Sequence, residues 1–165
     1  MNYKIIDNAL PQEDFLIIKN FIFDKRFSWH LIDGVTGNED ESLPNYASYY
    51  FSHIFWEGFD IQVEPSAMFS PLLNLMECRS IMRIKANCYP TTSEIIEHED
   101  HVDYPFSHKG AIFYLNTNNG LTIIEDEVKV ESIENRLLLF DSSKNHRSTT
   151  CTDAKCRINV NFNFF

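Results

Sequence analysis

The last stretch of the chain, Arg157–Phe165, reads RINVNFNFF and alternates between two kinds of side chain. Successive side chains of a β-strand point to opposite faces. One face would therefore be apolar, with Ile158, Val160, Phe162 and Phe164. The other would begin with a guanidinium and continue with amides, at Arg157, Asn159, Asn161 and Asn163. The apolar face belongs to a core, and the polar face is either solvated or lines a polar pocket with an anion-binding arginine at its mouth.

From residue 80 onward, short apolar runs alternate with turn signals such as TNNG and SSKNH. The runs before the last strand are SIMRIKANCY, IIEHEDHVDY, GAIFYLN, LTIIE, VKVESI and LLLFD. This spacing predicts about seven or eight strands in a β-sandwich or barrel.

The first part of the chain has helical rather than strand periodicity. Apolar residues recur at helical spacing over residues 11–23, with Pro11 and acidic residues at the start, which predicts an amphipathic helix. A second helix is predicted over 66–78, where Pro71 lies in the first turn or kinks it. Residues 33–45 are polar and predict an acidic loop. The aromatic residues that follow, Tyr46, Tyr49, Tyr50 and Phe51, either line a substrate entrance or pack a helix against the sheet.

The length of 165 residues fits one domain, with a supporting region over 1–79 and a β-core over 80–165. The net charge of −10 argues against broad binding to nucleic acid. No apolar run approaches the roughly 18 residues of a membrane span, and the start of the chain does not resemble a secretion signal. The four cysteines follow no CxxC pattern, which favours free thiols and a cytoplasmic location.

The stretch HEDHVDYPF, residues 98–106, contains His-x-Asp twice, at His98/Asp100 and His101/Asp103. A His and an Asp two apart at a strand end point the same way, with Cα atoms roughly 6–7 Å apart, and can reach one ion. His146, in the loop after LLLFD, is the candidate second histidine. Two histidines and one carboxylate leave positions open on Fe(II) for a chelating cosubstrate and O₂. His-x-Asp alone is also common on surfaces, so His146 and the later Arg157 strengthen the hypothesis.

Together these elements resemble the 2-oxoglutarate- and Fe(II)-dependent dioxygenases of the prolyl-hydroxylase-like branch. The chain is most similar to small stand-alone members that tailed phages of cyanobacteria encode. The resemblance covers roughly residues 80–165 and is carried by HVD (101–103), AIFYLN (111–116), TNNG (117–120), NH (145–146) and Arg157. It implies a mainly β (α+β) chain, a double-stranded β-helix (jelly roll) with supporting N-terminal helices.

The same resemblance implies roles for particular residues. Fe(II) would be held by His101, Asp103 and His146, while His98 and Asp100 would point away or lie behind the ligands. The distal carboxylate of 2-oxoglutarate would meet Arg157 and Tyr114. Further residues implied near the cosubstrate are Tyr89 and Asn161 and, more weakly, Asn87 and Thr122. The chain departs from many relatives in having Asn159 where Arg-x-Ser is usual and Asn119-Gly120 where Gly-Gly is usual.

The implied activity is hydroxylation of a peptidyl residue such as proline, or of a small molecule, with 2-oxoglutarate and O₂ as cosubstrates. Alternatives are a cupin-type metal-binding module without oxygenase activity and a structural phage protein. Nucleic acid is a disfavoured substrate because of the charge, no membrane contact is expected, and the enzyme would act in the cytoplasm, or the host cytoplasm if phage-encoded. The histidines without a partner at ligand spacing are expected to be structural or exposed: His30, His53 and His108.

Overall fold

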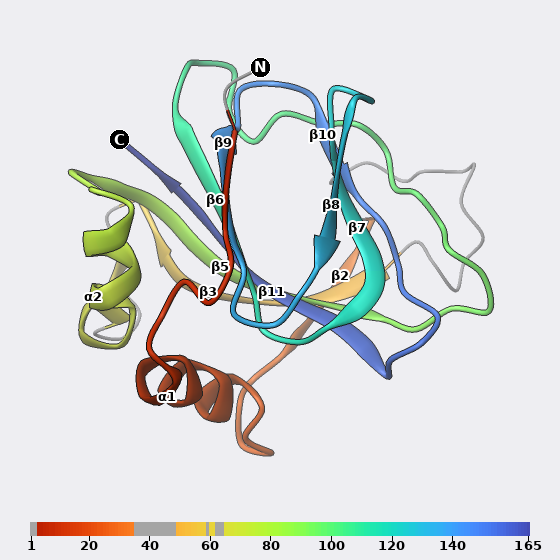
Figure 1. Ribbon diagram of the computed structural model, residues 1–165, viewed down its shortest axis with the longest axis horizontal. Coiled ribbons are helices and arrows are strands. Elements are labelled where there is room, and N and C mark those ends of the chain that lie inside the picture. Colours follow the sequence, from red (N-terminus) through yellow and green to blue (C-terminus); the bar gives the residue numbers. More distant parts are fainter. Residues whose placement is uncertain (1–2, 35–48, 59, 62–64) are drawn as a thin grey trace.

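The computed structural model describes residues 3–34, 49–58, 60–61 and 65–165. Within them, an eight-stranded and a three-stranded antiparallel sheet face each other (Figure 1). The large sheet has the order β1 (Lys4–Ile6), β9 (Leu137–Asp141), β6 (Lys109–Tyr114), β11 (Cys156–Phe164), β5 (Ile81–Pro90), β3 (Tyr49–Glu57) and β2 (His30–Asp33), with β4 (Asp60–Ile61) paired to β3. The small sheet has the order β10 (His146–Ser148), β7 (Asn118–Ile124) and β8 (Val128–Ser132). This is the mainly β, jelly-roll arrangement that the sequence predicts.

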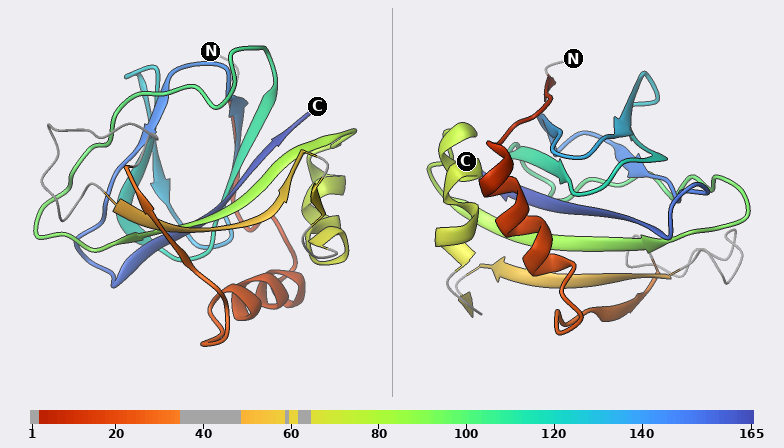
Figure 2. Two further views of the ribbon diagram at one scale, coloured as in Figure 1. Left: turned by 180° about the vertical axis from the view of Figure 1, so that it is seen from behind. Right: turned by 60° about the horizontal axis from the view of Figure 1, so that its bottom comes forward.

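Two helices, α1 (Gln12–Ile22) and α2 (Pro65–Leu75), cover the outer face of the large sheet (Figure 2). Helix α1 begins after Pro11 and has Glu13 and Asp14 in its first turn. The positive end of the helix dipole stabilises carboxylates at this position. Its buried side chains are Phe15, Ile18 and Ile22. Both predicted helices are confirmed, and Pro71 lies inside α2.

Strand β11 separates the two sides of the molecule. Its apolar side chains join the helices in the main core, which also includes Phe15, Phe69, Leu72, Ile84 and Phe113. Its polar side chains, from Arg157 to Asn163, face the interior between the sheets and are buried as well. Of the two interpretations of this polar face, the solvated one is therefore wrong.

A smaller core holds the two sheets together and fixes the position of β10. It contains Ile112, Tyr114, Ile124, Val130, Leu138 and Phe140. Strand β7 pairs with β8 on one side and with β10 on the other, so this core sets where the first residue of β10, His146, lies.

The order of elements differs from the sequence expectation in two places. Residues 80–165 form seven strands, but the run IIEHEDHVDY contributes only two isolated bridges, Glu97 to Thr149 and His101 to His146. The first 80 residues add β1, β2, β3 and β4, which were not predicted. Most of the expected acidic loop and Tyr46 lie outside the described residues, while Tyr49, Tyr50 and Phe51 belong to β3, which pairs with β2 and β5. Within the described residues, neither helix has the length and apolar character needed to cross a membrane.

Candidate metal centre and adjoining anion pocket

Backbone hydrogen bonds bring the two candidate histidine ligands together. The N–H of His101 donates to the carbonyl of His146, and the N–H of His146 donates to the carbonyl of His101, both at 3.0 Å. The first histidine lies on the loop between β5 and β6, and the second opens β10 after the turn that follows β9. The fold thus places two segments distant in sequence side by side.

Three side chains converge at this bridge. One ligand atom from each of His101, Asp103 and His146 lies within 4.8 Å of the others. The Nε2 atom of His146 is 3.7 Å from Oδ2 of Asp103, and the two imidazole rings are 4.5 Å apart between centroids. Two imidazoles and one carboxylate form the donor set of a facial triad, which suits Fe(II).

Both imidazoles are held by neighbouring groups. Nδ1 of His146 lies 2.9 Å from the carbonyl of Lys144, so it donates there and leaves the Nε2 lone pair directed at the triad. Phe140 packs against the same ring at 4.9 Å. Burial, and then the neighbouring His146, lower the pKa of His101, which favours the neutral imidazole that a metal requires.

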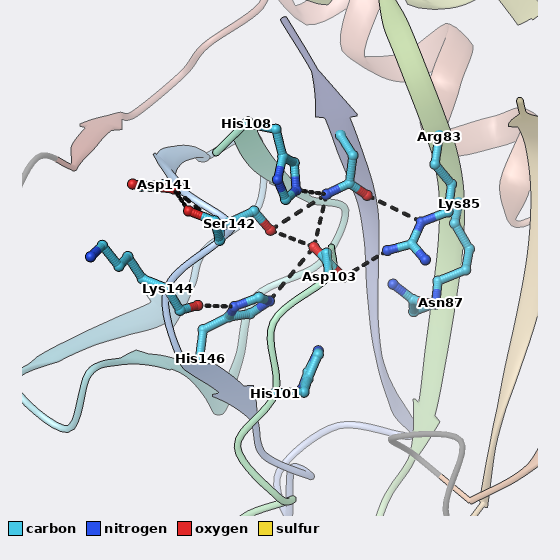
Figure 3. A network of polar contacts seen from close by, with 12 residues as sticks. Arg83, Lys85, Asn87, His101, Asp103, His108, Asp141, Ser142, Lys144 and His146 are labelled. Atoms are coloured by element: carbon cyan, nitrogen blue, oxygen red, sulfur yellow. Dashed lines mark hydrogen bonds and ion pairs between the residues drawn. The ribbon is translucent and has the colours of Figure 1, made fainter. Parts of the chain in front are cut away.

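Asp103 is the centre of a polar network (Figure 3). Its Oδ1 accepts a hydrogen bond of 2.7 Å from Arg83, and its Oδ2 accepts hydrogen bonds from Ser142 and, at 2.8 Å, from Asn163. Burial opposes ionisation of this carboxyl group, but Arg83, His146 and these hydrogen bonds outweigh it and hold the pKa of Asp103 well below its usual value. The carboxylate is therefore ionised and fixed in orientation.

The other His-x-Asp copy does not converge on the triad. His98 is buried, and its Nδ1 lies 2.8 Å from the hydroxyl of Ser148. Asp100 is exposed and pairs with Arg147 at 2.9 Å. These placements agree with the expectation that the first copy lies behind the ligands or points away from them.

Arg157 forms the second part of the site. Its side chain is completely buried. Its Nε donates to Ser132 at 2.7 Å, and its Nη2 donates to Thr122 at 2.8 Å, while the hydroxyl of Tyr114 donates to the same Thr122 oxygen at 2.8 Å. Among the described residues, Nη1 has no hydrogen-bond partner, and no carboxylate forms an ion pair with the guanidinium. A buried cation with a free donor is suited to an anionic ligand.

A cavity of about 30 Å³ connects Arg157 with the metal triad. Its lining residues include His101, His146, Arg157, Tyr89, Asn87, Asn159, Asn161 and Thr122. The side-chain oxygens of Asn87 and Asn161 are buried without a partner among the described residues. Tyr89 stacks on Tyr50 at 5.3 Å, and the guanidinium of Arg157 lies over the Tyr89 ring at 5.5 Å. Of the sequence-predicted site residues, Asp103 and Tyr114 are not part of this lining; Asp103 lies beside the two histidines, and Tyr114 bonds the lining residue Thr122.

Strand register gives the separation between the two parts of the site. In the small sheet His146 pairs with Ile124, and Ser148 pairs with Thr122, which holds the guanidinium. Two residues along a strand correspond to roughly 7 Å. The triad and the residue that holds Arg157 therefore lie about two residues apart along the small sheet.

Sequence reasoning missed two residues that hold Asp103, namely Arg83 and Ser142. A weak signal for Arg83 existed, because it has the same strand parity as Asn87 and Tyr89. No pattern marks Ser142, which reaches Asp103 only through the fold. His108 was expected to be structural or exposed. Its ring is buried, and its Nε2 lies 3.1 Å from the side-chain nitrogen of Asn163, so it supports the network around Asp103.

Gly120 is required for the position of Arg157. A Cβ atom at this residue would lie 2.6 Å from Cδ of Arg157 and 2.8 Å from the carbonyl of Thr150. We expect Gly120→Ala to lower the free energy of unfolding by about 1–3 kcal/mol through overpacking and to displace the guanidinium. Thermal unfolding would measure this. Gly58→Ala is the control, because no heavy atom lies within 4 Å of its Cβ and only its positive φ adds a cost; equal loss in both variants would contradict the prediction.

Comparison with known proteins gives matches in structure only. No protein-family model and no curated protein matches the sequence. A prolyl hydroxylase from Trichoplax adhaerens, in complex with a peptide of hypoxia inducible factor, is 16% identical with a TM-score of 0.63, covering 99% of this chain and 83% of that one. A Pseudomonas putida prolyl-4-hydroxylase is 17% identical with a TM-score of 0.64, covering 98% and 91%.

A third match has a higher TM-score but a lower identity. It is an oxidoreductase of the 2OG-Fe(II) oxygenase family from Burkholderia pseudomallei, 9% identical with a TM-score of 0.71, covering 98% of this chain and 84% of that one. These matches extend over nearly the whole chain, including the helices and the strands of the first 80 residues. The chain therefore has the fold of the 2-oxoglutarate- and Fe(II)-dependent oxygenases, as the prolyl hydroxylases do.

Proposed function

We propose that this chain is an Fe(II)- and 2-oxoglutarate-dependent dioxygenase that hydroxylates a peptidyl residue, such as proline, or a small molecule. The observation that carries the proposal is the meeting of two features at one cavity. The facial triad supplies three metal donors, and the buried Arg157 supplies a free guanidinium donor in the lining of the same cavity as the two histidines.

The residues at the triad fit Fe(II). His101, Asp103 and His146 would hold the metal, and the ionised state of Asp103 matches the need for a deprotonated ligand. Bound iron, with O₂ and the keto acid as reactants, would supply the oxidising chemistry. The chain's own contribution is to fix the ligands through Arg83, Ser142 and the backbone bridge, and to keep water out of a buried site.

The polar groups of the cavity fit 2-oxoglutarate. The distal carboxylate would accept hydrogen bonds from Nη1 of Arg157, next to the hydroxyl groups of Thr122 and Tyr114. A volume of about 30 Å³ holds only about two water molecules, so cosubstrate binding requires side chains in the cavity to rotate. Asn159 and Asn161 are the candidates, because both line the cavity. Many relatives have a serine, which is smaller, at the position of Asn159.

The surface around the ligands supports an extended apolar substrate. The loop that carries His101 and Asp103 also exposes Ile95, Val102 and Phe106, each by about two fifths of its surface or more. The Trichoplax neighbour is described as a complex with a peptide. Both observations favour a peptidyl substrate over a small polar one, because a peptide would cover exposed apolar side chains of this loop.

A metal-binding module without oxygenase activity is the alternative. Such a module needs the triad but has no use for a buried cation without a counter-ion, which is costly unless an anion arrives. The two functions differ in 2-oxoglutarate binding, and this is the quantity to measure.

Anaerobic titration with Fe(II) and then 2-oxoglutarate would test the proposal. We expect the visible charge-transfer band of a keto acid chelated to Fe(II), and we expect His146→Ala to abolish it because one of three donors is lost. His53→Ala is the matched control, since His53 lies outside the triad and bonds the carbonyl of Ser28. Bound iron without a band in the wild type would support the module instead.

A further inference from the structure

A second hollow lies on the opposite face of β5 and β11 from the metal cavity. It has a volume of about 440 Å³, and its walls include Phe23, Phe27, Trp29, Asn116, Lys25, Lys155, Cys88 and Cys156. The two thiols are free and partly exposed. The proposed oxygenase chemistry uses neither of them.

The two cysteines are diagonal neighbours on adjacent strands. Cys156 pairs with Pro90, and Cys88 pairs with Ile158, so both side chains lie on the face that carries the helices. Both residues line the same hollow. Of the other cysteines, Cys151 is fully buried and directs its thiol to the carbonyl of Ala154.

The surroundings make the two thiols unequal. The neighbouring Cys88 thiol, and then the charge of Lys155, lower the pKa of Cys156. The neighbouring Cys156 thiol and burial raise the pKa of Cys88. Since the thiolate is the nucleophile, Cys156 would react first, and Cys88 is placed to attack the product.

We propose that Cys156 and Cys88 form a dithiol site that reacts with small anionic disulfides of the glutathione type. With glutathione disulfide as the reagent, the Cys156 thiolate attacks one of its two sulfur atoms. A mixed disulfide forms on Cys156, and one glutathione thiolate is released. The sulfur of Cys88 then attacks Cys156, its proton passes to the second glutathione as that leaves, and a Cys88–Cys156 disulfide remains. Two protein thiols are oxidised, and one glutathione disulfide is reduced to two thiols.

The charges of the hollow suit such a reagent. Lys25 and Lys155 are exposed at its edge and would attract the carboxylates of glutathione. The acid in the lining, Asp24, is engaged by Arg26 at 2.9 Å. Among the described parts of the chain neither lysine has an ion-pair partner, so the hollow presents positive charge next to the more reactive thiol.

Formation of the disulfide would reach the metal cavity. Diagonal residues in a sheet are about 7–8 Å apart between Cα atoms, whereas a disulfide spans roughly 4.4–6.8 Å, so the strands must shift. Tyr89 follows Cys88 and Arg157 follows Cys156, and both line the metal cavity. Oxidation should therefore weaken binding of the dicarboxylate, a consequence that rests on the proposed function.

Mass spectrometry of protein treated anaerobically with oxidised glutathione would test the site. We expect the wild type to end as the Cys88–Cys156 disulfide and Cys88→Ser to stop with one glutathione on Cys156. Cys156→Ser should react on the order of tenfold more slowly, because its remaining thiols are less ionised. Cys78→Ser, which changes a cysteine outside the hollow, should behave like the wild type.

Two results would overturn the site: reaction at Cys78 or Cys151 as fast as at Cys156, or a wild type that stops at the mixed disulfide. A second readout is 2-oxoglutarate affinity before and after oxidation, where several-fold weakening is expected in the wild type and none in Cys156→Ser. Unchanged affinity of the oxidised protein would overturn the coupling. Failure of the reduced protein to bind 2-oxoglutarate would instead count against the proposed function and leave the mass result standing.

Discussion

Asp103→Ala is expected to weaken Fe(II) binding by more than about 100-fold, because even loss of a group behind a metal ligand costs 10–100-fold. The substitution removes the only carboxylate of the triad and leaves the Arg83 cation facing the metal position. Anaerobic calorimetry with Fe(II), or with Mn(II) as a stable substitute, would measure the affinity. Asp100→Ala is the matched control, since it removes the acid of the other His-x-Asp copy, which pairs with Arg147 at the surface.

The same variant should also be less stable without metal. The side chains of Arg83 and Asp103 are 15% and 5% exposed, and breaking such a pair leaves an uncompensated charge that costs about 3 kcal/mol. The double variant Asp103→Ala/Arg83→Met should recover much of this stability but none of the iron affinity. Strong iron binding by Asp103→Ala, or its loss in Asp100→Ala, would mean that the triad is assigned to the wrong residues.

Arg157→Met is expected to lower 2-oxoglutarate affinity by on the order of 100-fold while iron affinity stays the same. The expected loss corresponds to charge-assisted hydrogen bonds to the distal carboxylate, at about 1.5–3 kcal/mol. Arg157→Lys should recover only part of this loss, because an ammonium group cannot reproduce the guanidinium fork. The amplitude and midpoint of the charge-transfer band in a 2-oxoglutarate titration would report both effects.

The free energy of unfolding of Arg157→Met distinguishes a loss of contacts to the cosubstrate from misfolding of the variant. Among the described residues Arg157 has no anionic partner, so a methionine of similar length removes a buried charge that no carboxylate compensates. The free energy of unfolding of ligand-free Arg157→Met should therefore be unchanged or higher. Arg136→Met, which removes a pair with the exposed Asp7, is the control for loss of an arginine. A destabilised Arg157→Met with normal cosubstrate affinity would give Arg157 a structural role.

Strand β11 shows how much of the fold a sequence pattern can predict. Its alternation places an apolar face on the helices and a polar face in the interior, and both faces follow from the period of two. The pattern alone could not distinguish a solvated polar face from a buried one. That distinction depends on the small sheet, which covers the face through contacts distant in sequence.

Strand β3 was not predicted because its pattern is mixed. It lies between β5 and β2 in the sheet, and both of its faces carry aromatic or apolar residues, so YYFSHIFWE has no clear alternation. The opposite mismatch occurs at IIEHEDHVDY, where the sequence predicts a strand and the structure has the loop that contains His101. Its apolar residues Ile95 and Val102 are exposed, and its strand-type pairing is limited to two isolated bridges.

The site was predictable where chemistry is carried by residue type and spacing. His101, His146 and Arg157 line one cavity, and Asp103 lies beside the two histidines, although their roles as ligands stay predictions. The partners of Asp103 were not predictable in the same way. Arg83 and Ser142 lie 20 and 39 residues away in sequence; strand parity gives only a weak signal for Arg83, and no local pattern marks Ser142.

The reciprocal backbone bridge between His101 and His146 has a consequence for which ion the centre would take. The bridge and the network around Asp103 hold the donor atoms close together through contacts within the protein. These side chains would therefore need to move little when an ion binds. Rigid sets of nitrogen and oxygen donors bind divalent first-row ions in the Irving–Williams order, in which Fe(II) is weaker than nickel, copper or zinc. Which ion occupies the centre in a cell would then depend on metal supply and not on affinity, and zinc would be a natural competitor that blocks turnover.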